Sequence, residues 1–250
     1  MKLIAHRGLS SQAPENTFAS FEASIINNFN IIEFDVQLTK DKTPVIIHDY
    51  SVNRTTNGSG EIKDINLKEL LKLDAGSWFN KKFEDEKIPI LEDVLIKYFG
   101  ICHFQIELKS DERRLAEITL EILKKTKWIN NYNNTPYLIP SFSITSFNIN
   151  HIIRINKLNP EINIGWLYKS DKIVDKDIVD TLIDNNINMF IPSTKSPLWK
   201  NLELQRILTE KKITLCAWGA EDIKDVIKLR KTKAKAMTVN WPDEAKKYLL

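Results

Sequence analysis

Cysteine is rare in this chain, with Cys102 and Cys216 as the 2 examples among 250 residues. This count excludes a disulfide-rich secreted scaffold, and the two positions lack the close spacing of a zinc site. We expect two buried, reduced thiols. The length can bury one substantial core, so we expect a single domain over residues 1–250.

Glycine is also rare, with 7 residues. None of them belongs to a G-x-G-x-x-G or Walker loop, so the sequence gives no support to nucleotide binding through such a loop. The G-x-S-x-G elbow of serine hydrolases and the H-E-x-x-H motif of zinc proteases are absent as well, which removes the support for those two chemistries.

Long apolar runs are missing, and no stretch reaches the roughly 18 apolar residues that a membrane span needs. Between Lys2 and His6 the N-terminal segment holds only Leu3, Ile4 and Ala5, which is too little for a signal-peptide core. We therefore expect a cytoplasmic protein without stable membrane anchoring. The net charge of +3 comes from 36 basic and 33 acidic residues spread along the chain, so no basic block indicates a nucleic-acid partner.

Alternation of strand and helix is the main pattern that is present. Apolar residues recur at helical spacing between short apolar runs, as Phe18, Phe21 and Ile25 do. This order predicts right-handed βαβ units, and at this length a closed (β/α)8 TIM barrel of the α/β class fits better than an open parallel sheet. The candidate strands are "KLIAH", "IIEFDV", "PVIIH", "HFQIEL", "YLIPSF", "INIGWLY", "MFIPS", "TLCAW" and "KAMTV".

The candidate strands exceed the number in such a barrel by one. The segment "LTKDKTP" between the second and the third is too short for a crossover helix, so it indicates a hairpin. Residues 49–89 then interrupt the alternation, because "NRTTNGSG" is turn-rich and "DAGSWFNKKFEDEKIP" is polar without a clear period. We expect a small insertion subdomain after the third strand, at about residues 49–89.

Two of the strands carry acidic residues inside an apolar run. In "IIEFDV" the side chains of Glu33 and Asp35 share one face and, in a barrel, look inward near the mouth where such folds place their active sites. The same alternation in "FQIELK" points Glu107 and Lys109 inward. Carboxylates held this close repel each other and lose hydration, so they need a cation or hydrogen-bond donors.

Both histidine-containing strand ends point to the same mouth. His6 and Arg7 end the first strand, and Ile46 and His48 are expected to face inward at the end of the third. If residues 36–46 form a hairpin, His48 falls roughly opposite Asp35. Histidines beside carboxylates at strand ends favour proton transfer over a core role.

The ligand types at this mouth favour a hard cation. Carboxylate oxygens from Glu33, Asp35 and Glu107 suit Mg²⁺ or Ca²⁺ better than zinc, although a purely structural ion network is the alternative. With a divalent ion bound, Arg7 and Lys109 leave a surplus of positive charge, which invites an anion. A phosphodiester fits, because the cations would neutralise its oxygens while two histidines share the proton transfers.

The residues that carry this chemistry, read in order, resemble the glycerophosphodiester phosphodiesterase family. The resemblance is dense over residues 3–109 and thinner afterwards. It rests on "HRG" at 6–8, "PENT" at 14–17, "IEFDVQLTKD" at 32–41, "HD" at 48–49, "RTTNGSG" at 54–60, "IPILEDVL" at 88–95 and "IELK" at 106–109.

The resemblance implies metal-dependent hydrolysis of glycerophosphodiesters, such as glycerophosphocholine or glycerophosphoethanolamine, to sn-glycerol 3-phosphate and an alcohol. It also implies a barrel with an inserted subdomain. Which histidine is the acid and which is the base stays open. Carried over by motif, the metal ligands are Glu33, Asp35 and Glu107, the acid–base pair is His6 and His48, and the phosphate-binding residues are Arg7 and Lys109.

Trp218 is expected either to stack on the glycerol moiety or to fill the barrel. The chain departs from the family pattern nearby, with Gly219, Ala220 and Glu221 after this tryptophan and Asn240 near the end. The wall of the substrate pocket is therefore expected to differ from that of relatives.

Two alternatives stay open at this point. One is a phospholipid-directed enzyme with the same site, either a lysophospholipase D or a lyase that leaves a cyclic phosphate. The other is a silent barrel that binds glycerophosphodiesters. In "PENT", Asn16 or Thr17 is a good helix N-cap, and Glu15 is expected to hydrogen-bond the first loop. A direct contact of these residues with the substrate is the alternative.

Overall fold

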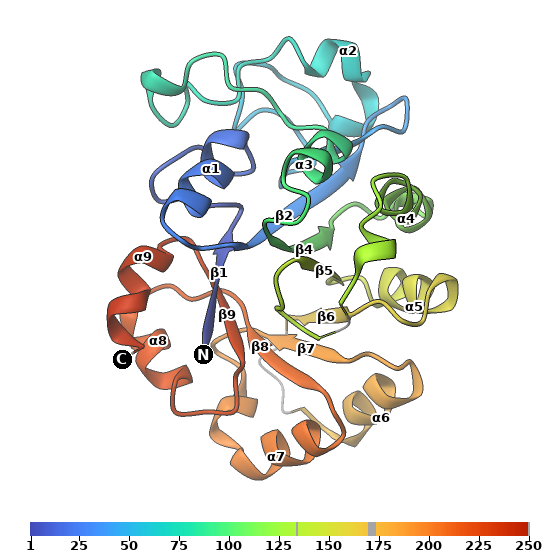
Figure 1. Ribbon diagram of the computed structural model, residues 1–250, viewed down its shortest axis with the longest axis vertical. Helices are drawn as coiled ribbons and strands as arrows, with labels where there is room; N and C mark the ends of the chain where they lie inside the picture. The colour runs from blue at the N-terminus through green and yellow to red at the C-terminus, as the bar shows by residue number, and fades with distance from the viewer. Residues whose placement is uncertain (134, 170–173, 250) are drawn as a thin grey trace.

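A closed barrel of parallel strands forms the centre of the molecule (Figure 1). The computed structural model describes residues 1–133, 135–169 and 174–249. Within them, a 9-stranded sheet runs in the order β1-β9-β8-β7-β6-β5-β4-β2-β3, and an additional β1–β2 pairing closes it. Since only β3 is antiparallel to its neighbour, the predicted (β/α)8 barrel is confirmed.

The bounds of the strands follow the apolar runs. They are β1 (Lys2–His6), β2 (Ile31–Leu38), β3 (Pro44–Ile46), β4 (His103–Leu108), β5 (Ser141–Ser146), β6 (Ile164–Tyr168), β7 (Met189–Pro192), β8 (Thr214–Ala217) and β9 (Ala236–Val239).

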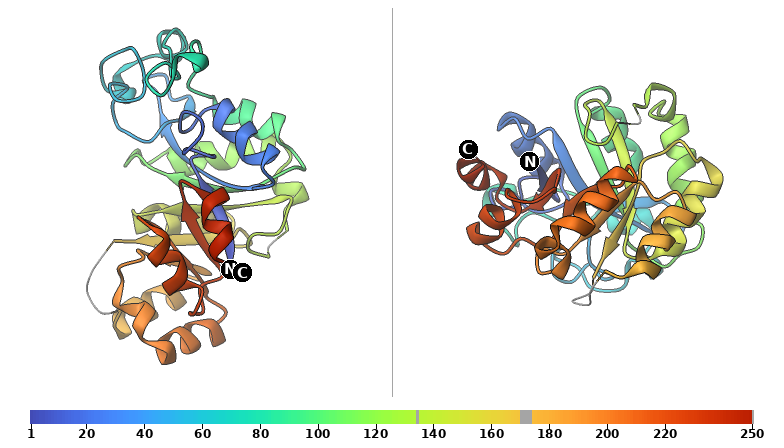
Figure 2. Two further views of the ribbon diagram at one scale, coloured as in Figure 1. Left: turned by 90° about the vertical axis from the view of Figure 1, so that its left-hand side faces the viewer. Right: turned by 90° about the horizontal axis from the view of Figure 1, so that it is seen from below.

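Helices surround the barrel, as Figures 1 and 2 show from three sides. The first begins at Phe18, and of the two N-cap candidates in the sequence it is Thr17 that caps this helix, in a reciprocal capping box with Ser20. No described helix is long and apolar enough to cross a membrane. The helices are α1 (Phe18–Ile26), α2 (Leu67–Leu70), α3 (Leu91–Lys97), α4 (Leu115–Lys125), α5 (Ile149–Leu158), α6 (Lys176–Asp184), α7 (Leu202–Glu210), α8 (Ile223–Leu229) and α9 (Pro242–Ala245).

The two faces of β2 pack into different cores. On β2, Phe34 joins the large cluster between sheet and helices, where its ring lies 5.7 Å from that of Phe21 and 5.1 Å from that of Phe104. Ile31 on the opposite face joins a small cluster inside the barrel with Ile4. Replacing a buried Phe by Ala typically costs about 3–5 kcal/mol. The outer cluster therefore fixes which face of β2 looks inward.

Two expectations about the strands are wrong. β5 begins at Ser141, not at Tyr137, because Phe142 and Ile144 alternate with small polar residues that suit the inner face. Tyr137 instead fills the inner cluster, where its hydroxyl donates to Cys216 Sγ at 2.8 Å. Ile46 does not face inward; it packs among the outer cluster, because β3 lies outside the closed barrel.

The expected hairpin joins β2 to β3, with Val36 opposite Ile46. The backbone N–H of Ile47 donates to the carbonyl of Asp35 at 3.0 Å, so the register differs by one residue from the expected 35–48 pairing. The following segment, cyan to green at the top of Figure 1, has its own apolar cluster around Val52 and Leu70. It contains α2 and two 3₁₀ turns, Ile62–Asp64 and Lys81–Phe83. The bounds of the insertion subdomain stay a prediction.

Candidate active site

Three buried carboxylates meet at the mouth of the barrel. Glu33 and Asp35 lie on β2, and the register pairs Asp35 with Glu107 on β4. One oxygen atom from each of the three lies within 4.8 Å of the others. The alternation within two strands therefore brings these side chains together as the sequence predicts.

The three carboxyl groups of this acidic cluster differ in pKa. Burial raises the pKa of Glu33 well above its ordinary value, and burial with the charge of Asp35 raises the pKa of Glu107 to about 7. Burial acts to raise the pKa of Asp35 too, but nearby cations overcome it and lower that pKa. Oε1 of Glu33 and Oδ1 of Asp35 are buried without a hydrogen-bond partner. Such atoms are ready to accept a cation.

Two cations flank the carboxylates. Arg7 places Nε 3.3 Å from Oδ2 of Asp35, and its backbone N–H donates to Oε2 of Glu33 at 3.1 Å. Nζ of Lys109 lies 3.0 Å from Oε1 of Glu107 and 3.6 Å from Oδ1 of Asp35. Burial acts to lower the pKa of Lys109, but the carboxylates raise it, so the ammonium stays charged.

The turn after β1 explains why Arg7 can reach the cluster. Arg7 has φ +57° and Gly8 has φ +83°, a left-handed conformation that favours glycine. A Cβ at Gly8 would lie 2.4 Å from Oγ of Ser20 on α1, so no side chain fits there. The close approach of the loop to α1 thus requires the glycine of the "HRG" motif.

Each of the two predicted histidines has a partner at Nδ1. His6 Nδ1 donates to Oδ1 of Asn240 at 2.5 Å, and His48 Nδ1 lies 2.6 Å from Oδ1 of Asp49. Because the oxygen of an amide or a carboxylate accepts, Nδ1 carries the proton and leaves Nε2 for the cavity. Burial lowers the pKa of His6 to about 4 and also lowers that of His48.

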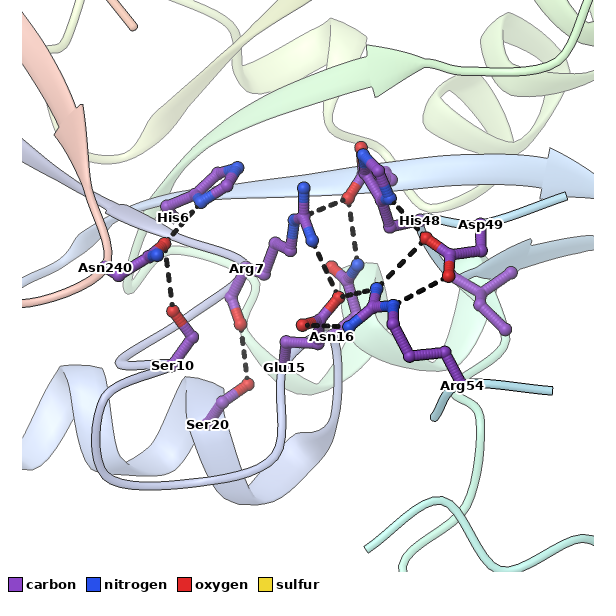
Figure 3. A network of polar contacts seen from close by, with 12 residues as sticks. His6, Arg7, Ser10, Glu15, Asn16, Ser20, His48, Asp49, Arg54 and Asn240 are labelled. Atoms are coloured by element: carbon purple, nitrogen blue, oxygen red, sulfur yellow. Dashed lines mark hydrogen bonds and ion pairs between the residues drawn. The ribbon is translucent and has the colours of Figure 1, made fainter. Parts of the chain in front are cut away.

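Sequence reasoning predicted the contact of Glu15 with the first loop but missed the rest of the network behind these groups (Figure 3). Glu15 accepts from Nη1 of Arg7 at 2.7 Å, and Nδ2 of Asn16 donates to Oδ2 of Asp35 at 2.9 Å. Arg54 binds both Glu15 and Asp49. The motifs "PENT" and "RTTNGSG" were the available signal, but a motif does not tell which side chains touch.

The cavity at the mouth of the barrel, between the two histidines and the two cations, has a volume of about 180 Å³. Trp218 stands in its wall, with its ring 5.0 Å from that of Phe147 in an edge-to-face contact and its Nε1 donating to the carbonyl of Tyr168. The departures from the family pattern at Gly219, Ala220 and Asn240 line the cavity, whereas Glu221 lies in the neighbouring groove with Lys195. The residues that line the cavity are His6, Arg7, Glu33, His48, Gln105, Glu107, Lys109, Phe147, Leu167, Trp218, Gly219, Ala220, Thr238, Val239 and Asn240.

Known proteins resemble this chain over two thirds or more of its length. YhdW of Bacillus subtilis (strain 168), named provisionally as a glycerophosphodiester phosphodiesterase, is 34% identical over 97% of this chain and 96% of its own. A glycerophosphodiester phosphodiesterase of Caldanaerobacter subterraneus subsp. tengcongensis is 42% identical over 67% of this chain and 66% of its own. An Oleispira antarctica phosphodiesterase, solved with the product sn-glycerol-3-phosphate, superposes with a TM-score of 0.85 at 26% identity, covering 100% of this chain and 96% of its own.

A sequence model of the glycerophosphoryl diester phosphodiesterase family matches residues 6–244. This range begins at His6 and includes all the acidic, basic and imidazole groups of the cavity. The resemblance seen in the motifs is therefore confirmed, and the chain belongs to the glycerophosphoryl diester phosphodiesterase family, a family of phosphoric diester hydrolases.

Proposed function

We propose that this protein hydrolyses small glycerophosphodiesters, such as glycerophosphocholine or glycerophosphoethanolamine, to sn-glycerol 3-phosphate and an alcohol. The observation that carries the proposal is one cavity lined by two carboxylates, two cations and two histidines. A third carboxylate, Asp35, lies beside both cations and converges with the other two. The Oleispira antarctica relative, which was solved with sn-glycerol-3-phosphate, supports the product side.

A divalent cation fits the acidic cluster. Glu33, Asp35 and Glu107 would hold it, since their oxygens converge and two of them have buried atoms without a partner. Among the described residues, the group that could hold an ion consists of carboxylates alone, which suits Mg²⁺ or Ca²⁺ better than zinc. Such an ion supplies Lewis-acid stabilisation of the charge that gathers on the phosphoryl oxygens.

The side chains of the cavity supply the other requirements of phosphodiester hydrolysis. Arg7 and Lys109 are placed to bind the phosphate, because both stay charged and both line the cavity. His6 and His48 each present Nε2 for proton transfer, one toward the attacking oxygen and one toward the leaving oxygen. Trp218 offers an apolar wall for the glycerol or the leaving alcohol.

The test is direct. Purified protein is incubated with a panel of glycerophosphodiesters, with Mg²⁺ or Ca²⁺ and with EDTA, and released glycerol 3-phosphate is measured with a coupled dehydrogenase. We expect release that EDTA abolishes. Phosphorus NMR of the products separates hydrolysis from a lyase reaction that leaves a cyclic phosphate, and a lysophospholipid substrate tests the lysophospholipase D alternative. Tight binding of the panel without any turnover would instead indicate a silent binding protein.

A further inference from the structure

Arg54, in the expected insertion, makes an unusual set of contacts for a residue outside the cavity. Its Nε and Nη2 donate to the two oxygens of Asp49 at 2.7 and 3.0 Å. Its Nη1 and Nη2 donate to the two oxygens of Glu15 at 2.9 and 2.7 Å. One guanidinium therefore holds two carboxylates, each through both of its oxygens, which is the strongest geometry that arginine offers.

Both carboxylates reach onward to a group of the proposed active site (Figure 3). Asp49 lies 2.6 Å from Nδ1 of His48. Glu15 lies 2.7 Å from Nη1 of Arg7. A single side chain thus connects the end of β3, through His48, with the turn after β1, through Arg7.

We propose that Arg54 is a positioning residue, which fixes His48 through Asp49 and Arg7 through Glu15 and so makes the insertion a working part of the active site. The inference rests on the proposed function, because it assigns His48 and Arg7 to that reaction. Arg54 itself does not line the cavity among the described residues, so it acts through its two partners.

Charge gives the physical reason. Without Arg54, and counting the side-chain partners in the described part of the chain, Asp49 keeps its contact with His48 alone, and Glu15 keeps its contact with Arg7 alone. Glu15 would then attract the Arg7 guanidinium more strongly and compete with Asp35 and the phosphate for it. Asp49 would lose the two bonds from Arg54 that fix its carboxylate beside Nδ1 of His48, and the direction of Nε2 would become variable.

A purely structural reading makes Arg54 an ordinary surface ion pair, worth about 0–1 kcal/mol. Its side chain is 44% exposed, which favours that reading. Its two partners, however, are unlike those of an ordinary surface ion pair. The side chain of Glu15 is only 14% exposed, and both Glu15 and Asp49 contact groups of the cavity. Arg206 provides the contrast, because it pairs with Glu210 at 2.8 Å on the exposed surface of α7 and touches no group of the site.

The experiment compares Arg54→Ala, Arg54→Lys, Asp49→Asn and the double variant Arg54→Ala/Asp49→Asn, with Arg206→Ala as the matched control. Each is assayed with saturating Mg²⁺ or Ca²⁺ on the best substrate of the wild-type panel, and each is checked by thermal unfolding. We expect Arg54→Ala to lower kcat/KM by about tenfold to a hundredfold, as loss of an orienting partner does elsewhere. Arg54→Lys keeps the positive charge but lacks the paired N–H donors of the guanidinium, so it should recover only part of the lost kcat/KM.

Two further readouts separate positioning from folding. Added guanidinium ion, at concentrations well below denaturing ones, should rescue Arg54→Ala and leave Arg206→Ala unchanged, because the site is open to solvent. The double variant should lose less than the product of the two single losses, since both break one chain of contacts.

Full activity in a folded Arg54→Ala variant, or full additivity with Asp49→Asn and no rescue, would overturn the inference. A wild-type protein that releases no glycerol 3-phosphate from any substrate of the panel would instead overturn the proposed function. The two failures are therefore distinguishable.

Discussion

The two histidines of the cavity look alike in accessibility and differ in what stands behind them. The side chain of His6 is 31% exposed and that of His48 is 27% exposed. Both bind a partner through Nδ1, at 2.5 and 2.6 Å. The partner of His6 is the neutral amide of Asn240, whereas the partner of His48 is the carboxylate of Asp49.

The carboxylates near the histidines also differ from each other. Glu33, 3.8 Å from Nε2 of His6, has a pKa raised by burial, whereas Asp35 has a lowered pKa and its charge acts to raise the pKa of both histidines. A carboxylate stabilises an imidazolium more strongly than a neutral amide does, because it adds a full negative charge to the hydrogen bond. The end of β3 is thus better suited to hold a proton than the end of β1, which favours His48 as the general acid.

The largest expected effect comes from removing either imidazole. His6→Ala and His48→Ala should each lower kcat by at least roughly a hundredfold with folding intact, because a positioned acid or base contributes about 10²–10⁴. The measurement is glycerol 3-phosphate release with saturating metal. His151→Gln is the control, since His151 contacts the carbonyl of Ser110 and does not line the cavity. Full activity in either alanine variant would remove that histidine from the reaction.

A better leaving group should divide the two histidines. With a 4-nitrophenyl ester of glycerol phosphate, the leaving oxygen needs no proton, so His48→Ala should recover most of its activity while His6→Ala should not. The measurement is the ratio of the rate with this ester to the rate with a glycerophosphodiester, in both variants. The variant in which this ratio rises identifies the general acid. Recovery in His6→Ala instead would reverse the roles.

The partners of the histidines come next. Asp49→Asn should lower kcat about a hundredfold, because an amide can present its N–H to Nδ1 and favour the wrong tautomer. Asn240→Ala should cost about tenfold, since it removes an orienting acceptor without a charge. Asn240→Asp tests the comparison itself, because it gives His6 the same kind of partner as His48. Equal losses of kcat in Asp49→Asn and Asn240→Ala would contradict the proposed difference between the partners of His48 and His6.

The affinity for the metal should fall more when a carboxylate of the buried acidic cluster is replaced than when a carboxylate on the surface is replaced. Glu107→Gln removes one charged ligand and is expected to raise the Kd for Mg²⁺ or Ca²⁺ by at least about tenfold, measured by calorimetry. Glu112→Gln is the control, because Glu112 pairs with Lys42 and stands outside the cluster. An unchanged Kd in Glu107→Gln would reject Glu107 as a ligand.

Period-two alternation was enough to place the acidic cluster, because an apolar outer face leaves Glu33, Asp35 and Glu107 only the interior. The partners of the histidines could not be predicted in this way. The contact of His6 with Asn240 joins positions 234 apart, and that of Arg54 with Glu15 joins positions 39 apart across a turn-rich segment. Such contacts depend on barrel closure and on loop conformation, which alternation does not encode. The error at β5 had a local cause, since "YLIPSF" is apolar without alternating.

The smallest expected effect is a change of stability with pH, which tests the raised pKa of Glu107. Burial and the charge of Asp35 raise the pKa of Glu107 from 4.5 to about 7 in the folded protein. A raised folded-state pKa contributes stability that is fully present below the unfolded value and is lost as pH rises through about 7. In EDTA, the wild-type protein should therefore lose Tm relative to Glu107→Gln between about pH 5 and pH 8.

Added Mg²⁺ or Ca²⁺ should act in the opposite direction, because the ion binds carboxylates that have released their protons. The metal-induced rise in Tm is then expected to be larger at about pH 8 than at about pH 6 for the wild type, and nearly independent of pH for Glu107→Gln. Differential scanning fluorimetry of the two proteins measures both trends. The same rise at both pH values would mean that the ion binds without displacing protons from this cluster, and Glu107 would then already be charged at about pH 6.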